Sequence, residues 1–91
     1  MTVYVDSMRA SFGRMLLSHM IADTHEELIG IAEAIDIQKK WIQHKGTAKE
    51  HFDISEKKRL IAIEMGAVEI TSKELVLKIK EKECLIKQKK Q

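Results

Sequence analysis

Two hydrophobic periodicities follow one another between residues 16 and 35, in the segment LLSHMIADTHEELIGIAEAI. As far as Ala22 the apolar residues have the spacing of a β-strand, and beyond it they repeat every three or four residues, as on one face of a helix. The helical positions are Leu28, Ile31, Ala32 and Ile35. Thr24 and Glu27 have the spacing of a capping box, in which each side chain accepts a hydrogen bond from the other residue's backbone N–H. We therefore predict a strand over residues 15–22 and a helix over residues 24–36.

Short β-branched or alternating runs predict strands in three other places, at residues 2–6, 51–54 and 67–70. The segment IQKKWIQ, residues 37–43, fits neither period cleanly, and we interpret it as a further strand that carries Trp41. Residues 7–14 and 44–50 are predicted to be loops, because Gly13 and Gly46 interrupt the patterns there.

Two more helices are expected in the second half of the chain. The first spans residues 56–65, with Ser55 as its N-terminal cap and Gly66 as its stop. Its inward-facing residues would be Leu60, Ile61, Ala62 and Met65. The last helix starts after Thr71 and Glu74, which repeat the capping-box spacing, and extends to about residue 87.

The alternation of helices and strands predicts an α/β fold, with one mixed sheet of about four to five strands and three helices that cover at least one of its faces. A chain of 91 residues is too short for two independent cores, so we expect a single domain over residues 1–91. Residues 71–91 would form a basic C-terminal helix with a frayed end, since seven lysines and three glutamates lie between residues 73 and 91.

Composition limits the cellular setting. The single cysteine, Cys84, cannot form an internal disulfide, which fits a reducing cytoplasm. No apolar run has the ~18–20 residues that cross a bilayer, and the N-terminus lacks the pattern of a signal peptide. We therefore expect a cytoplasmic protein without a membrane partner. The net charge of +2 is too small to indicate nucleic-acid binding by itself.

The first candidate site is a polar set at predicted strand ends and in the first loop, made up of Asp6, Arg9, Arg14, His19 and Asp23. Arginine forks bind two oxygens at once, and a helix N-terminus offers free N–H groups, so this set suits an anion such as phosphate. In the alternative, purely structural interpretation, the two aspartates cap turns, the arginines pair with them and His19 is a hydrogen-bonded core residue.

The second candidate is His51-Phe52-Asp53. Alternation along an extended segment places His51 and Asp53 on one face and Phe52 on the other. Such a pair can orient a proton-transfer base, or bind a metal together with His19. The chain has no HExxH, no paired CxxC and no glycine-rich phosphate loop. We therefore expect neither a metal nor a cofactor.

Two further features are less specific. Trp41 is the single tryptophan and has Lys39, Lys40 and His44 near it in sequence, so it either stacks on a flat ligand or fills the core. Positive charges at residues 57–59 oppose the dipole of the second predicted helix, which an anion site would explain, although solvated surface side chains also account for them.

These segments in this order resemble one known family. TVYVDSMRASFGRM, LSHMIADTHEEL, WIQ, HFDIS, KKR and GAVEIT are similar to domain of unknown function family 4031, a small uncharacterised family of bacteria and their phages, over residues 2–75. The resemblance implies no reaction. It implies recurrent polar positions at Asp6, Arg9, Gly13, His19, Asp23, Glu27, His51, Asp53 and Arg59.

The chain also departs from the family pattern. Ile29 stands where a histidine is usual, Phe52 where a tyrosine is usual, and Asp36 where a glycine is expected. Loss of a histidine and a phenolic hydroxyl weakens a shared catalytic mechanism, whereas anion binding by arginines would survive. We therefore lean away from an enzyme.

The leading hypothesis is a phage-encoded cytoplasmic protein that binds an anionic, nucleotide-like ligand and acts against host defence. Its ligand-binding residues would be Asp6, Arg9, Arg14, His19, Asp23, Trp41, His51, Asp53 and Arg59. One alternative is a hydrolase or nuclease that uses His19, His51 and Asp53. Another is an inhibitor that contacts a host protein, or nucleic acid through the lysine-rich C-terminal helix. Because the chain is short, we also expect a homo-oligomer.

Overall fold

The computed structural model describes residues 2–6, 10–12 and 15–89. Its elements in chain order are β1 (Val3–Asp6), β2 (Ala10–Phe12), β3 (Met15–Ala22), α1 (His25–Ala34), the 3-10 helix η1 (Lys39–Trp41), β4 (Phe52–Ser55), α2 (Glu56–Glu64), β5 (Val68–Ile70) and α3 (Ser72–Lys89). The fold is α/β, with a mixed sheet and three α-helices, as the sequence predicts.

The sheet is built around β3, the longest strand. β1 and β2 pair antiparallel with successive parts of β3, and β4 pairs antiparallel with its other edge. The two edges can be assigned because Met20 pairs with Val5 of β1 and also with Phe52 of β4. β5 adds to β1 in parallel and makes the sheet mixed. The strand β5, late in the chain, is therefore paired with β1, the first strand of the sheet.

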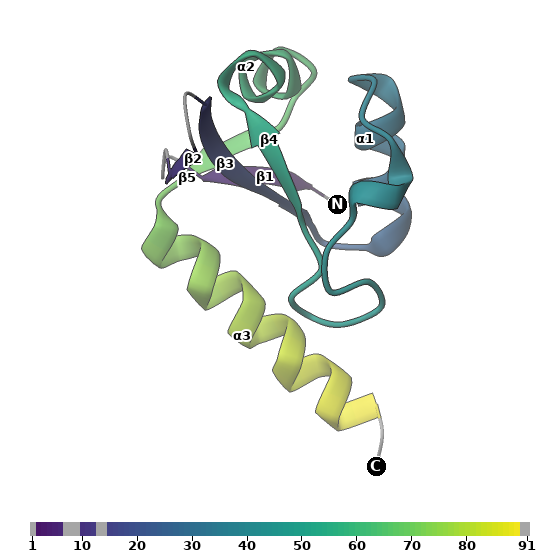
Figure 1. The fold of residues 1–91 in the computed structure, drawn as a ribbon. Coiled ribbons are helices and arrows are strands. Elements are labelled where there is room, and N and C mark those ends of the chain that lie inside the picture. The colour runs from purple at the N-terminus through teal and green to yellow at the C-terminus, as the bar shows by residue number, and fades with distance from the viewer. Residues whose placement is uncertain (1, 7–9, 13–14, 90–91) are drawn as a thin grey trace.

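The helices cover both faces of the sheet. α1 and α2 lie on one face, and α3 crosses the other as a long diagonal rod (Figure 1). The larger core lies under α1 and α2 and includes Val5, Met20, Leu28, Phe52 and Ile54, all of which are buried. A smaller cluster under α3 joins Ile21, Ile70 and Leu75, with Tyr4 and Ile79 packed against it. No helix in the described part of the chain is long and apolar enough to cross a membrane.

The predicted helix ends are confirmed. The Thr24 hydroxyl accepts a hydrogen bond from the backbone N–H of Glu27, and the Ser55 hydroxyl accepts one from Lys58. Thr71 and Glu74 form the full reciprocal box, since each side chain accepts a bond from the other's backbone N–H. Gly66 follows α2 with a φ of 107°, a left-handed conformation that glycine adopts without steric cost. These local signals fix where the helices begin and end.

Two predictions about segments are wrong. Residues 10–12 are not loop but the short strand β2, which pairs Ala10 with Leu17 and Phe12 with Met15. Residues 37–43 do not form a strand, because Lys39–Trp41 is a single 3-10 turn. The sheet edge beside β3 is occupied by β4 instead, and only Gln43 at the end of the segment makes an isolated bridge, to His51.

The inward face of α2 also differs from the prediction. Leu60 and Met65 are exposed, whereas Arg59 is 2% exposed. The Arg59 Nε donates to the backbone oxygen of Asp6, and its Nη2 pairs with Glu69. Tertiary hydrogen bonds therefore compensate the burial of this charge, and Arg59 is buried where Leu60 was expected.

Candidate functional site

One row of residues crosses the sheet on the face that α3 covers. The antiparallel register of β1 and β3, continued by one residue, places Asp6 opposite His19. The register of β3 and β4 places His19 opposite Asp53. Side chains directly opposite one another in an antiparallel pair lie on the same face, so the three polar side chains are neighbours. Strand pairing therefore assembles a site from segments far apart in the sequence.

Asp6 holds His19 from one side. The Asp6 side chain is fully buried, its Oδ1 accepts the backbone N–H of His19 at 2.8 Å, and its Oδ2 lies 2.8 Å from the His19 Nδ1. A carboxylate accepts hydrogen bonds, so the neutral form of the His19 imidazole carries its proton on Nδ1. The His19 Nε2 therefore presents a lone pair, on the side of the ring that faces away from Asp6.

His51 is oriented by its own backbone segment. Its Nδ1 lies 2.8 Å from the carbonyl oxygen of Lys49, which can only accept a hydrogen bond, so the His51 Nε2 also presents a lone pair. Phe52, the next residue, points to the other face and is buried in the larger core. The predicted separation of His51 and Asp53 from Phe52 is thus confirmed.

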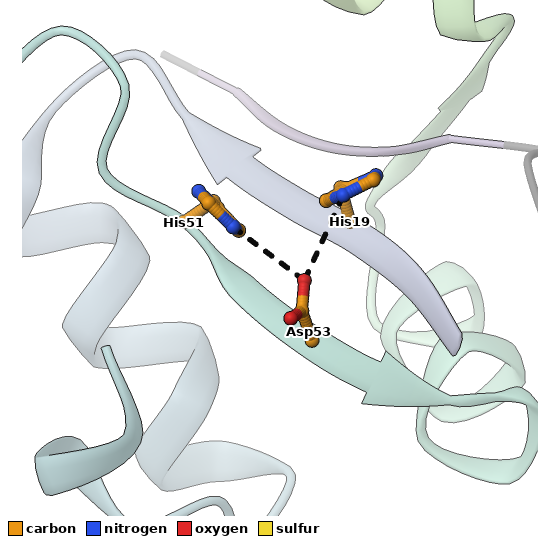
Figure 2. A group of neighbouring side chains, drawn as sticks. All are labelled: His19, His51 and Asp53. Atoms are coloured by element: carbon orange, nitrogen blue, oxygen red, sulfur yellow. Dashed lines mark ion pairs between the residues drawn. The ribbon is translucent and has the colours of Figure 1, made fainter. Parts of the chain in front are cut away.

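The two histidines converge on one carboxylate oxygen. The Asp53 Oδ1 lies 3.5 Å from the His51 Nε2 and 3.7 Å from the His19 Nε2 (Figure 2). The two imidazole rings meet edge to face, with their centroids 5.3 Å apart. The second oxygen of Asp53 accepts a hydrogen bond from the Gln43 side chain at 2.6 Å. The side chains of His19, His51 and Asp53 are therefore each held in place by a hydrogen bond to a neighbouring residue.

A cleft of about 400 Å³ opens beside these residues, between the sheet and α3. Its polar lining residues are His19, His44, Lys49, His51 and Lys80, with Glu83 as the acidic residue of the lining. Its apolar wall is formed by Ile21, Leu75, Val76 and Ile79. This volume lies within the range of small-molecule sites, which combine an apolar lining with a few polar groups.

The other residues of the predicted site are dispersed. Arg9 and Arg14 lie outside the described residues. Asp23 is at the opposite end of the sheet from Asp6, because β1 and β3 are antiparallel, and its carboxylate accepts the backbone N–H of Thr2. Arg59 approaches Asp6 from the far face, through the backbone oxygen.

Trp41 lies on η1 and does not line the cleft. Its side chain is 63% exposed, and the Lys40 Nζ lies 5.3 Å from the centroid of its ring. Trp41 therefore does not fill the core, and its position outside the cleft separates it from the histidines.

Sequence reasoning missed most of the cleft's other side. Val76, Ile79, Lys80 and Glu83 follow the i, i+3, i+4, i+7 spacing of one helix face, a signal that was present in the sequence. Lys49 belongs to the predicted loop 44–50, which carries the buried residues Ala48 and Glu50. The Glu50 carboxylate contacts the His25 Nδ1 at 2.6 Å, and this contact fixes the loop against the start of α1.

Fold and site together define a small mixed-sheet α/β protein with a histidine–carboxylate cleft. The chain belongs to the family described as Protein of unknown function (DUF4031), whose model matches residues 3–82. This result confirms the resemblance drawn from the sequence. No curated protein and no solved structure matches the chain significantly.

Proposed function

We propose that this protein binds a small anionic, nucleotide-like ligand in the cleft between the sheet and α3. The observation that carries the proposal is the composition of the lining. Two lysines and three histidines line the cleft together with four apolar side chains and one glutamate. A lining that combines positive charges with apolar side chains suits a ligand that carries both a phosphate and a flat base.

Lys49 and Lys80 have the central role in the anion-binding part of this proposal. They come from the loop before β4 and from α3, so they approach the same volume from two elements. The base would lie against Leu75, Val76 and Ile79, whose side chains form the apolar wall. The ligand would therefore bridge α3 and the sheet, and it would stabilise the protein by mass action.

Calorimetric titration with a panel of mononucleotides, dinucleotides and cyclic nucleotides tests the proposal. We expect at least one member to bind, and Lys49→Gln and Lys80→Gln each to weaken it about tenfold or more, the effect of losing one hydrogen bond to a charged group. Lys57→Gln, which removes an exposed charge from α2 on the opposite face, is the matched control and should change little. Absence of heat with every member, or equal affinities for the cleft and control variants, would refute it.

The Asp6–His19 pair favours hydrolysis as a second candidate function. An imidazole held by a buried carboxylate, with its other nitrogen facing a cleft, has the arrangement of a general base. Under this alternative the chain is a phosphoester hydrolase or nuclease, with His19 activating water. Recovery of the nucleotide unchanged after prolonged incubation supports binding alone, whereas products that disappear with His19→Gln support catalysis.

The proposal extends to the cellular setting, the cytoplasm of a bacterium infected by a phage. There a phage-encoded binder of this kind acts against host defence by sequestering a nucleotide signal. This extension is supported only by the resemblance to a family of bacteria and phages and by analogy of function. Expression in a host protected by nucleotide signalling should raise phage plating, and Lys80→Gln should abolish the gain.

Self-association also belongs to the proposal. Leu77 and Leu85 are about half exposed on α3, which supports burial of this helix against a second copy. Light scattering at micromolar concentration tests this, and a monomeric mass would contradict it.

A further inference from the structure

We propose that His19, His51 and Asp53 bind a divalent first-row transition metal ion of the zinc class. This inference replaces the expectation of no metal, which rested on the absence of the common linear motifs. One potential ligand atom from each of the three residues lies within 4.8 Å of the other two. The inference stands on this geometry and does not depend on the nucleotide proposal.

The protonation of the two imidazole rings determines which of their nitrogens can bind a metal ion. Each Nδ1 faces a group that only accepts, the carboxylate of Asp6 or the carbonyl of Lys49, so in the neutral rings, the forms that bind metal ions, each Nδ1 carries the proton. The two Nε2 lone pairs then face the Asp53 Oδ1. Three electron-pair donors thus converge on one point. A cation at that point converts mutual repulsion into attraction.

Hydrogen bonding does not account for the convergence. The separations of 3.5 Å and 3.7 Å exceed the 2.7–3.2 Å of N–H···O bonds. They do match metal ligation, because ligands about 2.1 Å from a tetrahedral zinc ion lie about 3.4 Å from one another. The distances therefore need only small side-chain shifts to close around an ion.

Each proposed ligand is hydrogen-bonded to a further group of the kind that orients ligands in metal sites. Histidines that bind metals commonly donate their other N–H to a carboxylate or a backbone carbonyl, and the bound carboxylates are hydrogen-bonded in turn. Here Asp6 holds His19, the Lys49 carbonyl holds His51, and the Gln43 amide holds the second oxygen of Asp53. The ligands lie on or beside paired strands, which keeps their spacing rigid.

The donor set selects the class of ion. Imidazole nitrogens with one carboxylate suit zinc and other first-row ions, whereas Mg²⁺ requires oxygen ligands. His19 and His51 also line the cleft, so a fourth ligand position would be open to solvent or to a bound anion. An open position is the mark of a catalytic or ligand-binding metal site, and a purely structural zinc site has four protein ligands.

Titration of the full chain with Zn²⁺ and with Co²⁺, in the absence of any nucleotide, tests the inference. We expect one ion per chain, and cobalt absorption bands of a four- or five-coordinate site. His51→Asn keeps a donor for the Lys49 carbonyl but removes the Nε2, and Asp53→Asn keeps the shape but removes the charge. Mutation of a group that only hydrogen-bonds to a metal ligand typically costs about 10–100-fold in metal affinity. Because His51 and Asp53 are proposed ligands themselves, both variants should lose more than that.

His44→Asn is the matched control. His44 lines the same cleft and lies 5.8 Å from His51, centroid to centroid, but it is not one of the three ligands. Its φ is 56°, a conformation that asparagine tolerates, so the substitution adds no strain. Cys84→Ser removes the exposed thiol as an alternative ligand and should leave the stoichiometry unchanged.

The outcomes are separable from those of the nucleotide proposal. Zinc binding that survives both His51→Asn and Asp53→Asn, or that falls equally with His44→Asn, overturns the metal site. Absence of cobalt bands in the folded wild-type protein also overturns it. Circular dichroism shows whether each variant is folded, and nucleotide titrations with and without a chelator test the other proposal on their own.

Discussion

Asp6→Asn is the substitution that discriminates most sharply between an oriented site and an incidental cluster. Asparagine is nearly isosteric with aspartate, so the fully buried position stays filled. Its amide oxygen can still accept the His19 backbone N–H, but its NH₂ group then faces the His19 Nδ1. The imidazole must move its proton to Nε2 to accept this new donor. The lone pair that faced Asp53 and the cleft is thereby lost.

The cost in stability follows from the two bonds. A hydrogen bond to a charged group contributes about 1.5–3 kcal/mol and a neutral one about 0.5–1.5 kcal/mol. Two such bonds change from charged to neutral, and the smaller desolvation cost of the amide offsets part of the loss. We expect a net destabilisation of about 1.5 kcal/mol, which lowers the Tm of a domain of this size by about 6–12 °C.

The assay is long-range ¹H–¹⁵N correlation of the labelled imidazole at alkaline pH, with thermal unfolding measured in parallel. The wild-type His19 should show the Nδ1–H tautomer and Asp6→Asn the Nε2–H tautomer. Asp53→Asn is the control, because Asp53 lies 3.7 Å from the His19 Nε2 and does not set the tautomer. Retention of the Nδ1–H form in Asp6→Asn, or a switch in Asp53→Asn, would refute the reasoning.

Three other substitutions test the surrounding structure. The buried Ser18 Oγ has no hydrogen-bond partner among the described residues. Ser18→Ala should therefore raise the free energy of unfolding, measured by urea denaturation, by about 1 kcal/mol, and a loss of stability would contradict this. Arg59→Met removes the donor to the Asp6 carbonyl and should cost about 1–3 kcal/mol by the same measurement, so an unchanged midpoint would count against that bond. A hydrogen bond with Tyr4 raises the pKa of Lys78 above its ordinary value of 10.5, and Tyr4→Phe should lower this pKa in NMR titration. The stabilisation from that bond is present below pH 10.5 and is lost as the pH rises through the raised pKa.

Local chemistry explains which parts of the fold could be predicted. The hydroxyl caps at Thr24, Ser55 and Thr71 act within three residues, so the helix starts are readable from sequence. The side-chain period of two placed His51 and Asp53 on one face for the same reason. Such features depend on neighbours along the chain and need no knowledge of the tertiary structure.

Features that depend on strand pairing could not be predicted. The grouping of Asp6 with Asp23 assumed that both strand ends lie at one edge, but antiparallel pairing of β1 and β3 separates them. The burial of Arg59 in place of Leu60 is a tertiary effect, since its hydrogen bonds go to the Asp6 backbone oxygen on β1 and to Glu69 on β5. The sequence did suggest His19 as a neighbour of His51 and Asp53, and the β3–β4 register places His19 opposite Asp53.

The two ring nitrogens of His19 have different roles, one in the stability of the fold and the other in the proposed metal site. The Nδ1 side faces a fully buried carboxylate, and its hydrogen bond stabilises the fold. The Nε2 side faces Asp53 and the cleft at a distance too long for a hydrogen bond, so it contributes little to the folded state without a ligand. Asp53→Asn should therefore leave the stability of the metal-free protein unchanged or raise it, since it relieves the convergence of lone pairs, while it removes metal binding. A change at one side of a single ring thus affects folding, and a change at the other affects the proposed site alone.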